Sequence, residues 1–569
     1  MYDFLRNSYL DANNFFSNRA GVPLPSFKRN QFGFSLGGPV VIPRLYNGHD
    51  KTFFFVDYEG LRQDTETEML TTVPTARERA GDFSGDMNSS GQHITIYDPL
   101  TTTATVSPSG TTYTRTAFPN NYIDPSRFDP VAANIIKYFP LPNIPGTFGH
   151  NNYFATASAP YTIDQYDIKI DDVLSPRQRV NFRFSKRNPV NGYAPLFPAS
   201  IAVALDAAAF AEPAIGAGLN YSFAKSSNYI FELRAGVSHV YFNTITAGNG
   251  FNPTQLGFPG YLAATALATS RNALTFPGIA PSGYVSIGSG NQLSNGTAGY
   301  LADTFLINNT KVTGRHTLNF GGEFRILANN DDQVGRATGA FGFGTNFTQG
   351  PNALTASSTA GDGFASFLVG LGGGDVTHFF KVIDTVSHYT GIYIQDDWMA
   401  TDRLTLNMGL RYDLFLPRTE RHNRTTYLDL SVPSPLAAVT GISGLKGGLE
   451  YAGVDGNPRT VTNTNYNNFA PRFGFAYHPA QALVVRGAFG IFFTNNPNQA
   501  ASTVVPTGFR TDSPYLGTIN GATPNYFLSN PYPNSSFIPV TGSSLGLLTN
   551  TGGGIGAGRR HQPSPYTEN

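Results

Sequence analysis

The sequence contains no cysteine. This absence excludes disulfide frameworks, thiolate zinc sites, iron–sulfur clusters and cysteine nucleophiles. It suits a chain that crosses an oxidising periplasm, although cytosolic proteins can also lack cysteine. A run of about 18 apolar residues, the length of a transmembrane helix, is also missing. Residues 1–6 have neither the basic start nor the apolar core of a signal peptide, so an export signal would have to lie outside this sequence.

Charged residues are scarce as well. They make up 13% of the 569 residues, with 38 basic against 38 acidic side chains. A neutral chain has no electrostatic footprint for a polyanion, so nucleic acid is not expected as a partner. The chain instead has 61 Gly, 39 Pro, 45 Phe and 29 Tyr. So many aromatic side chains argue against a disordered protein, because their apolar surface must be buried.

Helical periodicity is nearly absent, and the best helix candidate is the short segment 130–139. Strand-like alternation is common instead. In segment 404–414 the even positions are apolar and the odd positions are polar or glycine, so a strand there would have one apolar and one polar face. The same sorting occurs near 180–185, 231–238, 318–326 and 472–478.

The spacing of these segments carries a second signal. They come in pairs joined by tight turns at 175–178, 225–228, 313–316, 400–403 and 479–481, where Pro, Gly, Asn, Asp and Ser supply turn chemistry. Long polar stretches at 188–218, 244–302, 328–387 and 416–467 separate the pairs. Short turns that alternate with long loops are typical of an outer-membrane β-barrel, with the turns in the periplasm and the loops outside.

The sequence therefore predicts an all-β fold, an antiparallel transmembrane β-barrel with about 12 strands in this chain. An Arg that faces lipid at mid-bilayer costs about 2–4 kcal/mol, so charged residues of polar parity should face the lumen. The predicted lumen-facing residues, which could contact a plug or a ligand, are Arg183, Glu232, Arg234, Glu323, Arg325, Arg411, Asp413 and Arg472. Tyr389, Tyr393, Tyr412 and Phe415 are expected in interfacial aromatic girdles, with Trp398 near the turn side. A secreted β-sandwich or β-helix is the alternative, but such long loops are uncommon there.

Several motifs are more specific than the alternation. The stretches 3–7 and 10–16 resemble the junction between plug and barrel in Oar-like TonB-dependent receptors. Segments 29–33, 36–40, 51–55 and 58–62 are similar to the first barrel hairpin of that family, and 73–75 with 79–84 to the loop that follows it. Tyr393–Trp398, Leu410–Asp413 and Asn468–Phe475 resemble strand motifs of these barrels.

The resemblance implies a large barrel in the cell outer membrane of a Gram-negative-type bacterium, closed by a plug and energised by a TonB-type complex. Such barrels have about 22 strands. It implies the end of a plug at 1–30, a partial barrel at 31–495 and a long extracellular loop at 496–569 that leads to a further strand. The chain is therefore expected to be a fragment, with outer-membrane lipid as a partner and an unidentified small molecule, glycan or peptide as ligand.

No catalytic, cofactor or metal site is expected, and the chain is not predicted to be an enzyme. Gly33–Gly37 matches the spacing of a nucleophile elbow, but it lies in an alternating segment without the strand–turn–helix context. Gly370–Asp375 is glycine-rich without the end of a phosphate loop, and flexibility is the expected role. In a strand the adjacent Asp396 and Asp397 point to opposite faces.

Three functions remain open. The leading hypothesis is an active-transport receptor of the outer membrane. The second is a structural or adhesive outer-membrane protein whose loops mediate surface contact without uptake. The third, a secreted β-rich enzyme acting on glycans, lacks a convergent acid pair at a strand end.

Overall fold

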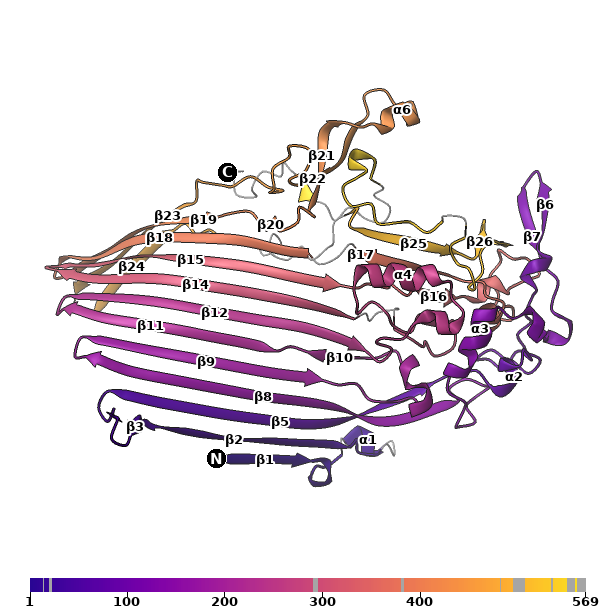
Figure 1. The fold of residues 1–569 in the computed structure, drawn as a ribbon, viewed down its shortest axis with the longest axis horizontal. Coiled ribbons are helices and arrows are strands. Elements are labelled where there is room, and N and C mark those ends of the chain that lie inside the picture. The colour runs from indigo at the N-terminus through magenta and orange to yellow at the C-terminus, as the bar shows by residue number, and fades with distance from the viewer. Residues whose placement is uncertain are drawn as a thin grey trace.

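The computed structural model describes residues 1–13, 15–19, 23–289, 295–379, 383–480, 482–494, 507–533, 536–549 and 558–559. These residues form one large antiparallel sheet, several small sheets and short helices (Figure 1). None of the described helices is both long and apolar enough to cross a bilayer.

The large sheet has 15 strands. In chain order they are β1 (Tyr2–Asn7), β2 (Phe27–Pro39), β5 (Thr52–Thr71), β8 (Tyr153–Ser175), β9 (Gln178–Asn191), β10 (Ala208–Ala211), β11 (Ala214–Ser226), β12 (Tyr229–Thr246), β14 (Gly296–Thr313), β15 (His316–Gln333), β18 (Ile383–Thr401), β19 (Leu404–Phe415), β20 (Thr419–Glu420), β23 (Phe469–Ala480) and β24 (Leu483–Gly490). All of the predicted strands are present. The predicted antiparallel sheet is confirmed, and in the described residues β1 and β24 form its two edges.

Short turns and long connections alternate as predicted. The hairpins β8–β9, β11–β12, β14–β15 and β18–β19 turn at 176–177, 227–228, 314–315 and 402–403, and the turn between β23 and β24 includes Gln481, which lies outside the described residues. The long connections leave from the opposite ends of the strands, and most of them lie on the right in Figure 1, whereas the connection between β19 and β23 lies at the top. At the turn end, β3 (Val41–Ile42) and β4 (Tyr46–Asn47) form a small hairpin between β2 and β5.

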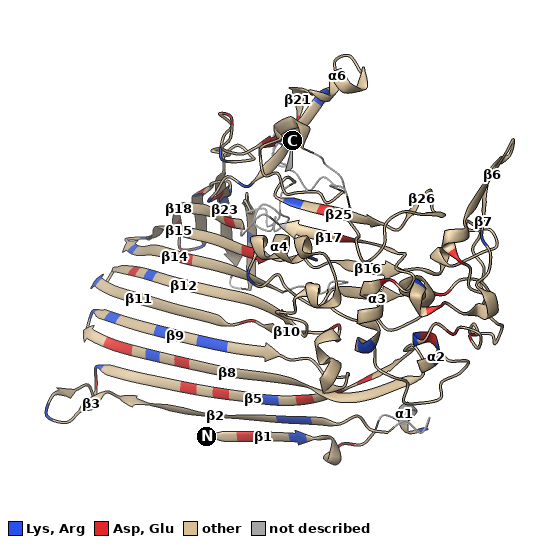
Figure 2. Cartoon of the chain, turned by 45° about the vertical axis from the view of Figure 1, so that its right-hand side comes forward, with Lys and Arg blue, Asp and Glu red and all other residues tan. Residues whose placement is uncertain are grey.

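The register sorts the side chains into two faces. Directly paired residues share a face of the sheet, and apolar side chains follow one face from β2 to β24. Large exposed apolar side chains on this face are Phe34, Leu36, Ile168, Ile170, Phe182, Leu219, Val237, Phe305, Ile307, Phe320, Phe324, Ile392, Ile394, Met408, Leu410, Phe469, Phe473, Val485 and Phe489. Charged side chains interrupt the strands throughout, as Figure 2 shows for β5, β8 and β9.

The apolar face forms a band of limited height. On β8 the residues of this face run, from the turn, Asp172, Ile170, Ile168, Tyr166 and Asp164. The apolar part thus lies between two carboxylates about as far apart as a bilayer-crossing strand needs, roughly 9–11 residues. β8 itself has 23 residues and β5 has 20, so both extend beyond the band.

Polar and aromatic residues mark the borders of the band. At the loop side Arg62 binds Asp164 with 2.7 Å between Nη2 and Oδ1, and Tyr58 donates to the same carboxylate at 2.8 Å. At the turn side His316 stacks on Trp398, with 5.4 Å between ring centroids. This is the place predicted for Trp398.

Part of the predicted girdle is wrong. Tyr389, Tyr393 and Phe415 lie on the polar face of the sheet, since Tyr389 bonds Asp413 and stacks on Phe415 while Tyr393 bonds Asn308. Of the predicted girdle tyrosines, Tyr412 lies on the apolar face.

The long connections pack into a second body, here called the cap, made of residues 72–152, 192–207, 247–289, 334–379 and 507–533. Its strands are β6 (Thr103–Ser107), β7 (Gly110–Thr114), β13 (Gly278–Pro281), β16 (Ala340–Phe343), β17 (Gly373–Phe379), β25 (Arg510–Leu516), β26 (Thr518–Ile519) and β27 (Thr523–Pro524). Its helices are α2 (Ala76–Arg79), α3 (Pro130–Ile135), α4 (Gly260–Thr269), α5 (Gly363–Leu368) and the 3₁₀ turns η2 (Pro99–Thr101), η3 (Pro119–Asn121), η4 (Pro125–Arg127), η5 (Ile136–Tyr138), η6 (Ala199–Ala204), η7 (Pro253–Leu256) and η8 (Thr345–Phe347).

The cap has an apolar core of its own. Phe83 and Phe139 from the connection after β5 are almost completely buried in it, together with Phe276, Phe364 and Tyr515 from three other connections. The predicted short helix is confirmed as α3 with η5, and Val131 and Ile135 of α3 are fully buried. The long loops are therefore folded structure rather than simple polar connections.

Gly370–Asp375 lies in this core region, and the prediction of a flexible loop is wrong. Gly373–Asp375 begins β17, which pairs with β16 and β25 in a sheet ordered β13-β16-β17-β25. Gly374 has φ +136°, and an added Cβ would collide with the carbonyl of Ala340. Glycine is required there for a close backbone approach.

The remaining elements lie outside the cap. They are η1 (Ser8–Leu10), α1 (Phe15–Arg19), β21 (Thr426–Pro433), α6 (Leu436–Thr440), β22 (Lys446–Tyr451), η9 (Gly546–Leu548) and β28 (Gly558–Arg559). The predicted divisions at residues 30 and 495 stay predictions. Residues 2–7 pair with β2 in the large sheet, and the described part of 496–569 packs into the cap and beside β22.

Candidate functional site

The polar face of the sheet carries a compact patch of charged residues. In the register, one row across β12, β14, β15, β18 and β19 is Glu232, Asn308, Gly321, Tyr393 and Arg411. The adjacent row contains Arg234, Leu306, Glu323, Gly391 and Asp413, and the row beyond it contains Arg325 and Tyr389. Most of the predicted lumen-facing residues therefore converge on one patch, here called the wall patch.

Arg411 is the centre of the wall patch. Its Nε lies 2.8 Å from Oδ1 of Asp413, and its Nη2 lies 3.5 Å from Oε2 of Glu323 on β15. Tyr389 donates to the same Asp413 oxygen at 2.6 Å and also contacts the Arg411 guanidinium. Only 22% of the Arg411 side chain and 6% of the Asp413 side chain are exposed, so the charges neutralise one another in a partly dry place.

Gly391 explains how Arg411 reaches across β18. It lies between Glu323 and Asp413 in the register, and a Cβ there would collide with the Arg411 guanidinium and the Tyr389 hydroxyl. The missing side chain leaves the space through which β19 is linked to β15.

Aromatic rings extend the patch. The Arg325 guanidinium lies 5.4 Å from the centre of the Tyr389 ring and also forms an ion pair with Glu323. Tyr393 passes over Gly321 and donates to Asn308 on β14 at 2.8 Å. Such cation–π and hydrogen-bond contacts fix the orientation of the charged groups.

The remaining predicted residues are less connected. Glu232 and Arg234 bind each other at 3.1 Å at the β12 end of the patch. Arg183 lies several strands away and binds Asp167 at 2.8 Å. Arg472 lies under Phe492, 4.7 Å from the ring centre. The predicted role of these residues in contacting a plug or a ligand stays a prediction.

Sequence reasoning missed several members of the wall patch. Tyr389, Tyr393 and Asn308 were not predicted there, although Tyr389 and Tyr393 share the odd parity of Gln395 and Asp397. That parity was the signal that could have found them. Parity could also have predicted Asp167, the partner of Arg183, on the polar face, since it alternates with the apolar-face residues Tyr166 and Ile168.

A second concave site lies in the cap. A cavity of about 760 Å³ is bounded by the connection after β5, the segment after β13 and the start of α5. Arg77, Glu78, Asp86, Tyr284 and Asp362 are among its lining residues. Burial and the nearby Glu78 raise the pKa of Asp362 to about 7, and burial with Glu78 and Asp362 raises that of Asp86 to about 9. The cavity is therefore polar but holds less negative charge than its carboxyl groups suggest.

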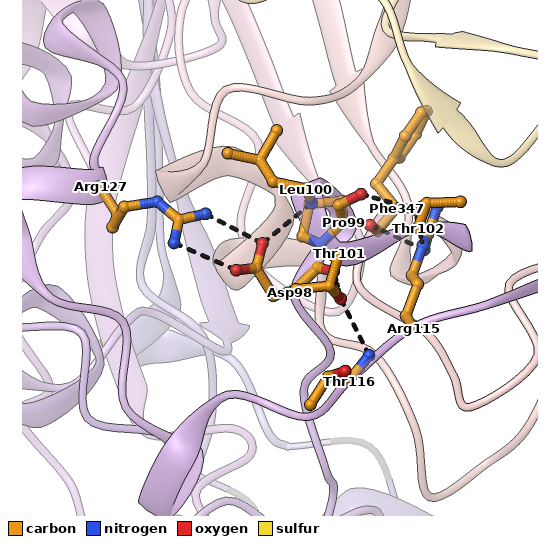
Figure 3. Close-up of polar contacts among 9 residues, drawn as sticks. All are labelled: Asp98, Pro99, Leu100, Thr101, Thr102, Arg115, Thr116, Arg127 and Phe347. Atoms are coloured by element: carbon orange, nitrogen blue, oxygen red, sulfur yellow. Dashed lines mark hydrogen bonds and ion pairs between the residues drawn. The ribbon is translucent and has the colours of Figure 1, made fainter.

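Buried arginines hold the cap connections together. The Arg115 guanidinium donates to the carbonyl groups of Asn346, Phe347, Gln349 and Ala522 at 2.6–3.1 Å. Burial lowers its pKa to about 10, so it keeps its charge at neutral pH. Figure 3 shows Arg115 near Asp98, whose two carboxylate oxygens accept from Arg127 at 2.9 and 3.1 Å.

Asp98 also begins the turn η2, because its Oδ1 accepts from the backbone N–H of Leu100 at 2.9 Å. Its charge thus serves the turn and the ion pair together. Elsewhere, Gly33–Gly37 lies inside β2, paired with β5, and has no elbow geometry. In the part of the chain that the structure describes, no group of three His, Asp or Glu side chains could hold a metal ion.

Two-faced strands, short turns and a folded set of loops define a membrane β-barrel protein. The whole chain, residues 1–569, matches the family described as outer membrane beta barrel domain. The chain belongs to this family, and its place is the cell outer membrane. No curated protein matches the chain.

Among the solved structures that the chain matches are outer-membrane transporters and receptors. The transporter YddB from Escherichia coli is 10% identical with a TM-score of 0.38, and the match covers 86% of this chain and 51% of that one. The siderophore receptor PirA from Acinetobacter baumannii is 10% identical with a TM-score of 0.29, covering 82% and 50%. A mutant ferric enterobactin receptor PfeA from Pseudomonas aeruginosa is 9% identical with a TM-score of 0.26, covering 82% and 51%. The chain spans about half the length of these structures.

Proposed function

We propose that this chain is the barrel part of a TonB-dependent receptor, which takes up a ligand through a plugged barrel with energy from the inner membrane. The observation that carries the proposal is the wall patch. A barrel wall with no internal partner would gain little from a dense set of charges around Arg411, Glu323 and Asp413. A plug or a ligand inside the barrel would use such groups for hydrogen bonds and ion pairs.

The cap supports the same proposal. In outer-membrane barrels the long loops face the outside, so a cap built from them is the first surface that a ligand meets. Its cavity of about 760 Å³ is large enough for a small molecule, a short glycan or a short peptide. The ligand class stays open among these.

The experiment compares growth on defined nutrients. Cells with and without the full-length protein are given iron chelates, oligosaccharides or peptides as the limiting source, each with and without a working TonB complex. We expect one class to support growth only when both the protein and TonB are present. Equal growth of all strains on every source would overturn the proposal.

An adhesive protein is the second candidate. The hairpin β6–β7 favours it, because residues 103–107 are all exposed and project from the outer end of the cap (Figure 1). Replacing residues 103–114 by a short Gly-Ser turn separates the candidates. Loss of cell–cell adhesion with unchanged uptake would assign the hairpin to adhesion. If the protein is only a receptor, the variant should keep both uptake and the wild-type level of adhesion.

A further inference from the structure

Three cap connections meet at one buried tyrosine hydroxyl. Tyr284, which follows β13, donates to Oε1 of Glu78 on α2 at 2.5 Å. The same hydroxyl oxygen lies 3.2 Å from Oδ2 of Asp362, the residue that begins α5. Glu78 and Asp362 are 6% and 7% exposed, so water does not separate these groups. The contact joins the connections after β5, β12 and β15.

The number of protons at this junction is set by simple counting. A phenol has one hydrogen, and two ionised carboxylates can only accept. If both acids were ionised, one of the two short oxygen–oxygen contacts would have no hydrogen and would be repulsive. The geometry therefore favours a second proton, carried by one of the carboxyl groups.

The other contacts place that proton on Asp362. Both oxygens of Glu78 accept hydrogen bonds, Oε1 from Tyr284 and Oε2 from the backbone N–H of Thr75 at 2.5 Å. Oδ1 of Asp362 accepts from the N–H of Ala365 at 2.8 Å, so we assign the second proton to Oδ2, 3.2 Å from the Tyr284 hydroxyl, and with it the donation to Tyr284. In this assignment Asp362 donates a hydrogen bond to Tyr284, and Tyr284 donates one to Glu78.

We propose that these hydrogen bonds form a proton-dependent contact of the cap, here called the latch. Protonated Asp362 holds α5 against the connections that carry Tyr284 and Glu78, and loss of the proton releases α5. The latch would make the opening of the cap depend on the pH at the cell surface. The proposal concerns the cap alone and holds for either function considered above.

The surroundings favour a proton at neutral pH. Asp82 adds negative charge from the same connection as Glu78, and Arg77 is bound to it at 2.8 Å, whereas Asp86, with a pKa raised to about 9, is uncharged at neutral pH. His150 lines the same cavity and has its Nε2 3.0 Å from the carbonyl of Met87. Burial and Glu78 raise the pKa of Asp362 to about 7 from an ordinary value near 3.8. Because the folded pKa is the higher one, this stabilisation is complete below about pH 4 and is lost as the pH rises through 7.

Hydrogen exchange of the full-length protein in detergent tests the latch. The readout is the protection of the amides at 365–371, measured from pH 5.5 to 9 and divided by the intrinsic exchange rates. We expect protection in the wild type to fall by up to about tenfold per pH unit between pH 5.5 and 7, the slope for release of one proton, and to level off above pH 7. Asp362→Asn keeps the Ala365 contact and donates permanently to Tyr284, so its protection should stay high across the range.

Asp124→Asn is the matched control, because Asp124 caps η4 in the same cap and is exposed. It should keep the wild-type slope. If the protection of these amides in the wild type does not change with pH, the latch is overturned whatever the variants show. A slope that persists in Asp362→Asn and disappears in Asp86→Asn also overturns it, because the proton would then belong to Asp86.

Discussion

At the residue scale, the wall patch depends on one side chain that is absent. Gly391 leaves open the space that the Arg411 guanidinium and the Tyr389 hydroxyl occupy. Glycine in a strand interior is otherwise unfavourable, since it contributes no packing and costs conformational entropy. Its position between Glu323 and Asp413 gives it a purpose that composition alone does not show.

We expect Gly391→Ala to destabilise the barrel by about 1–2 kcal/mol, because the new methyl group must displace Arg411. The free energy of unfolding of the refolded protein in urea measures this. In an Arg411→Met background the same change should cost less, since only the Tyr389 hydroxyl is left for the methyl group to displace. Equal costs in both backgrounds would show that Gly391 acts on the backbone and not through Arg411.

Removal of the central charge should be more severe. Arg411→Met leaves Asp413 and Glu323 without their shared partner in a partly buried place, and we expect a loss of about 3 kcal/mol in the unfolding free energy. Arg183→Met is the comparison, because 65% of the Arg183 side chain is exposed and its ion pair should contribute about 1 kcal/mol or less. Similar losses for both variants would contradict the central role of Arg411.

The sequence predicted which residues share the polar face, but not which of them touch. Parity alone assigns Glu323, Arg411 and Asp413 to one face, because alternation is local. Whether they meet depends on the register between strands, which is set by distant turns. Tyr389 and Tyr393 were placed in the girdle because aromatic residues at strand ends are common there, whereas their parity places them beside Asp413 and Asn308.

At the element scale, the strands are longer than the alternation that predicts them. The segment 51–62 was predicted as a strand, whereas β5 continues to Thr71. On its outward face apolar residues give way to Arg62, Asp64, Glu66 and Glu68 above the lipid band. Both faces are then polar, so the periodic signal ends while the backbone pairing with β8 continues.

The cap could not be predicted from the sequence for a related reason. Phe83, Phe276, Phe364 and Tyr515 are separated by long polar stretches and follow neither a period of two nor one of 3.6. Their burial comes from contacts between connections that are far apart in sequence. Among the described helices of the cap, α3 is the one that the sequence predicted, because Val131 and Ile135 lie on one apolar face.

Arg115 tests the cohesion of the cap. Arg115→Met removes the donor shared by carbonyl groups of two other segments, and buried carbonyls without a partner are costly. We expect the cap of this variant to be cleaved at least tenfold faster by a protease while the barrel stays intact on gels. Arg77→Met, at an exposed ion pair of the cap, should be cleaved at the wild-type rate.

His378 makes the stability of the cap depend on pH in the acid range. Its ring is fully buried on β17 beside Phe537, 4.9 Å between ring centres, and burial lowers its pKa to about 4. The folded pKa is the lower one, so the stability that depends on the neutral ring is present above about pH 6.5 and is lost as the pH falls toward 4. The loss could reach about 3 kcal/mol.

Hydrogen exchange of the amides of β17 and β25 between pH 4 and 7 measures this effect. Protection should fall on acidification in the wild type and stay level in His378→Phe, which keeps the aromatic packing and cannot take a proton. A similar acid loss in both proteins would assign the pH dependence to another group.

At the scale of the whole molecule, the apolar face, the charged face and the cap occupy separate parts of the structure. Apolar side chains cover the outward face of the sheet over a band of bilayer height, charged side chains meet on the other face, and the long connections fold together at one end. The family assignment fits this arrangement over residues 1–569. The expected total of 22 strands and the ligand stay predictions.

The central claim is that the wall patch faces an aqueous interior. Cysteine labelling tests it most directly, because the natural sequence has no cysteine to interfere. Single cysteines are placed at Leu233 and Arg234 on β12 and at Leu410 and Arg411 on β19, in the full-length protein in lipid vesicles. We predict that positions 234 and 411 react with a water-soluble thiol reagent, while positions 233 and 410 react only with a lipid-phase reagent. The reverse pattern would contradict the account, since it would turn the charged face of every strand toward the lipid.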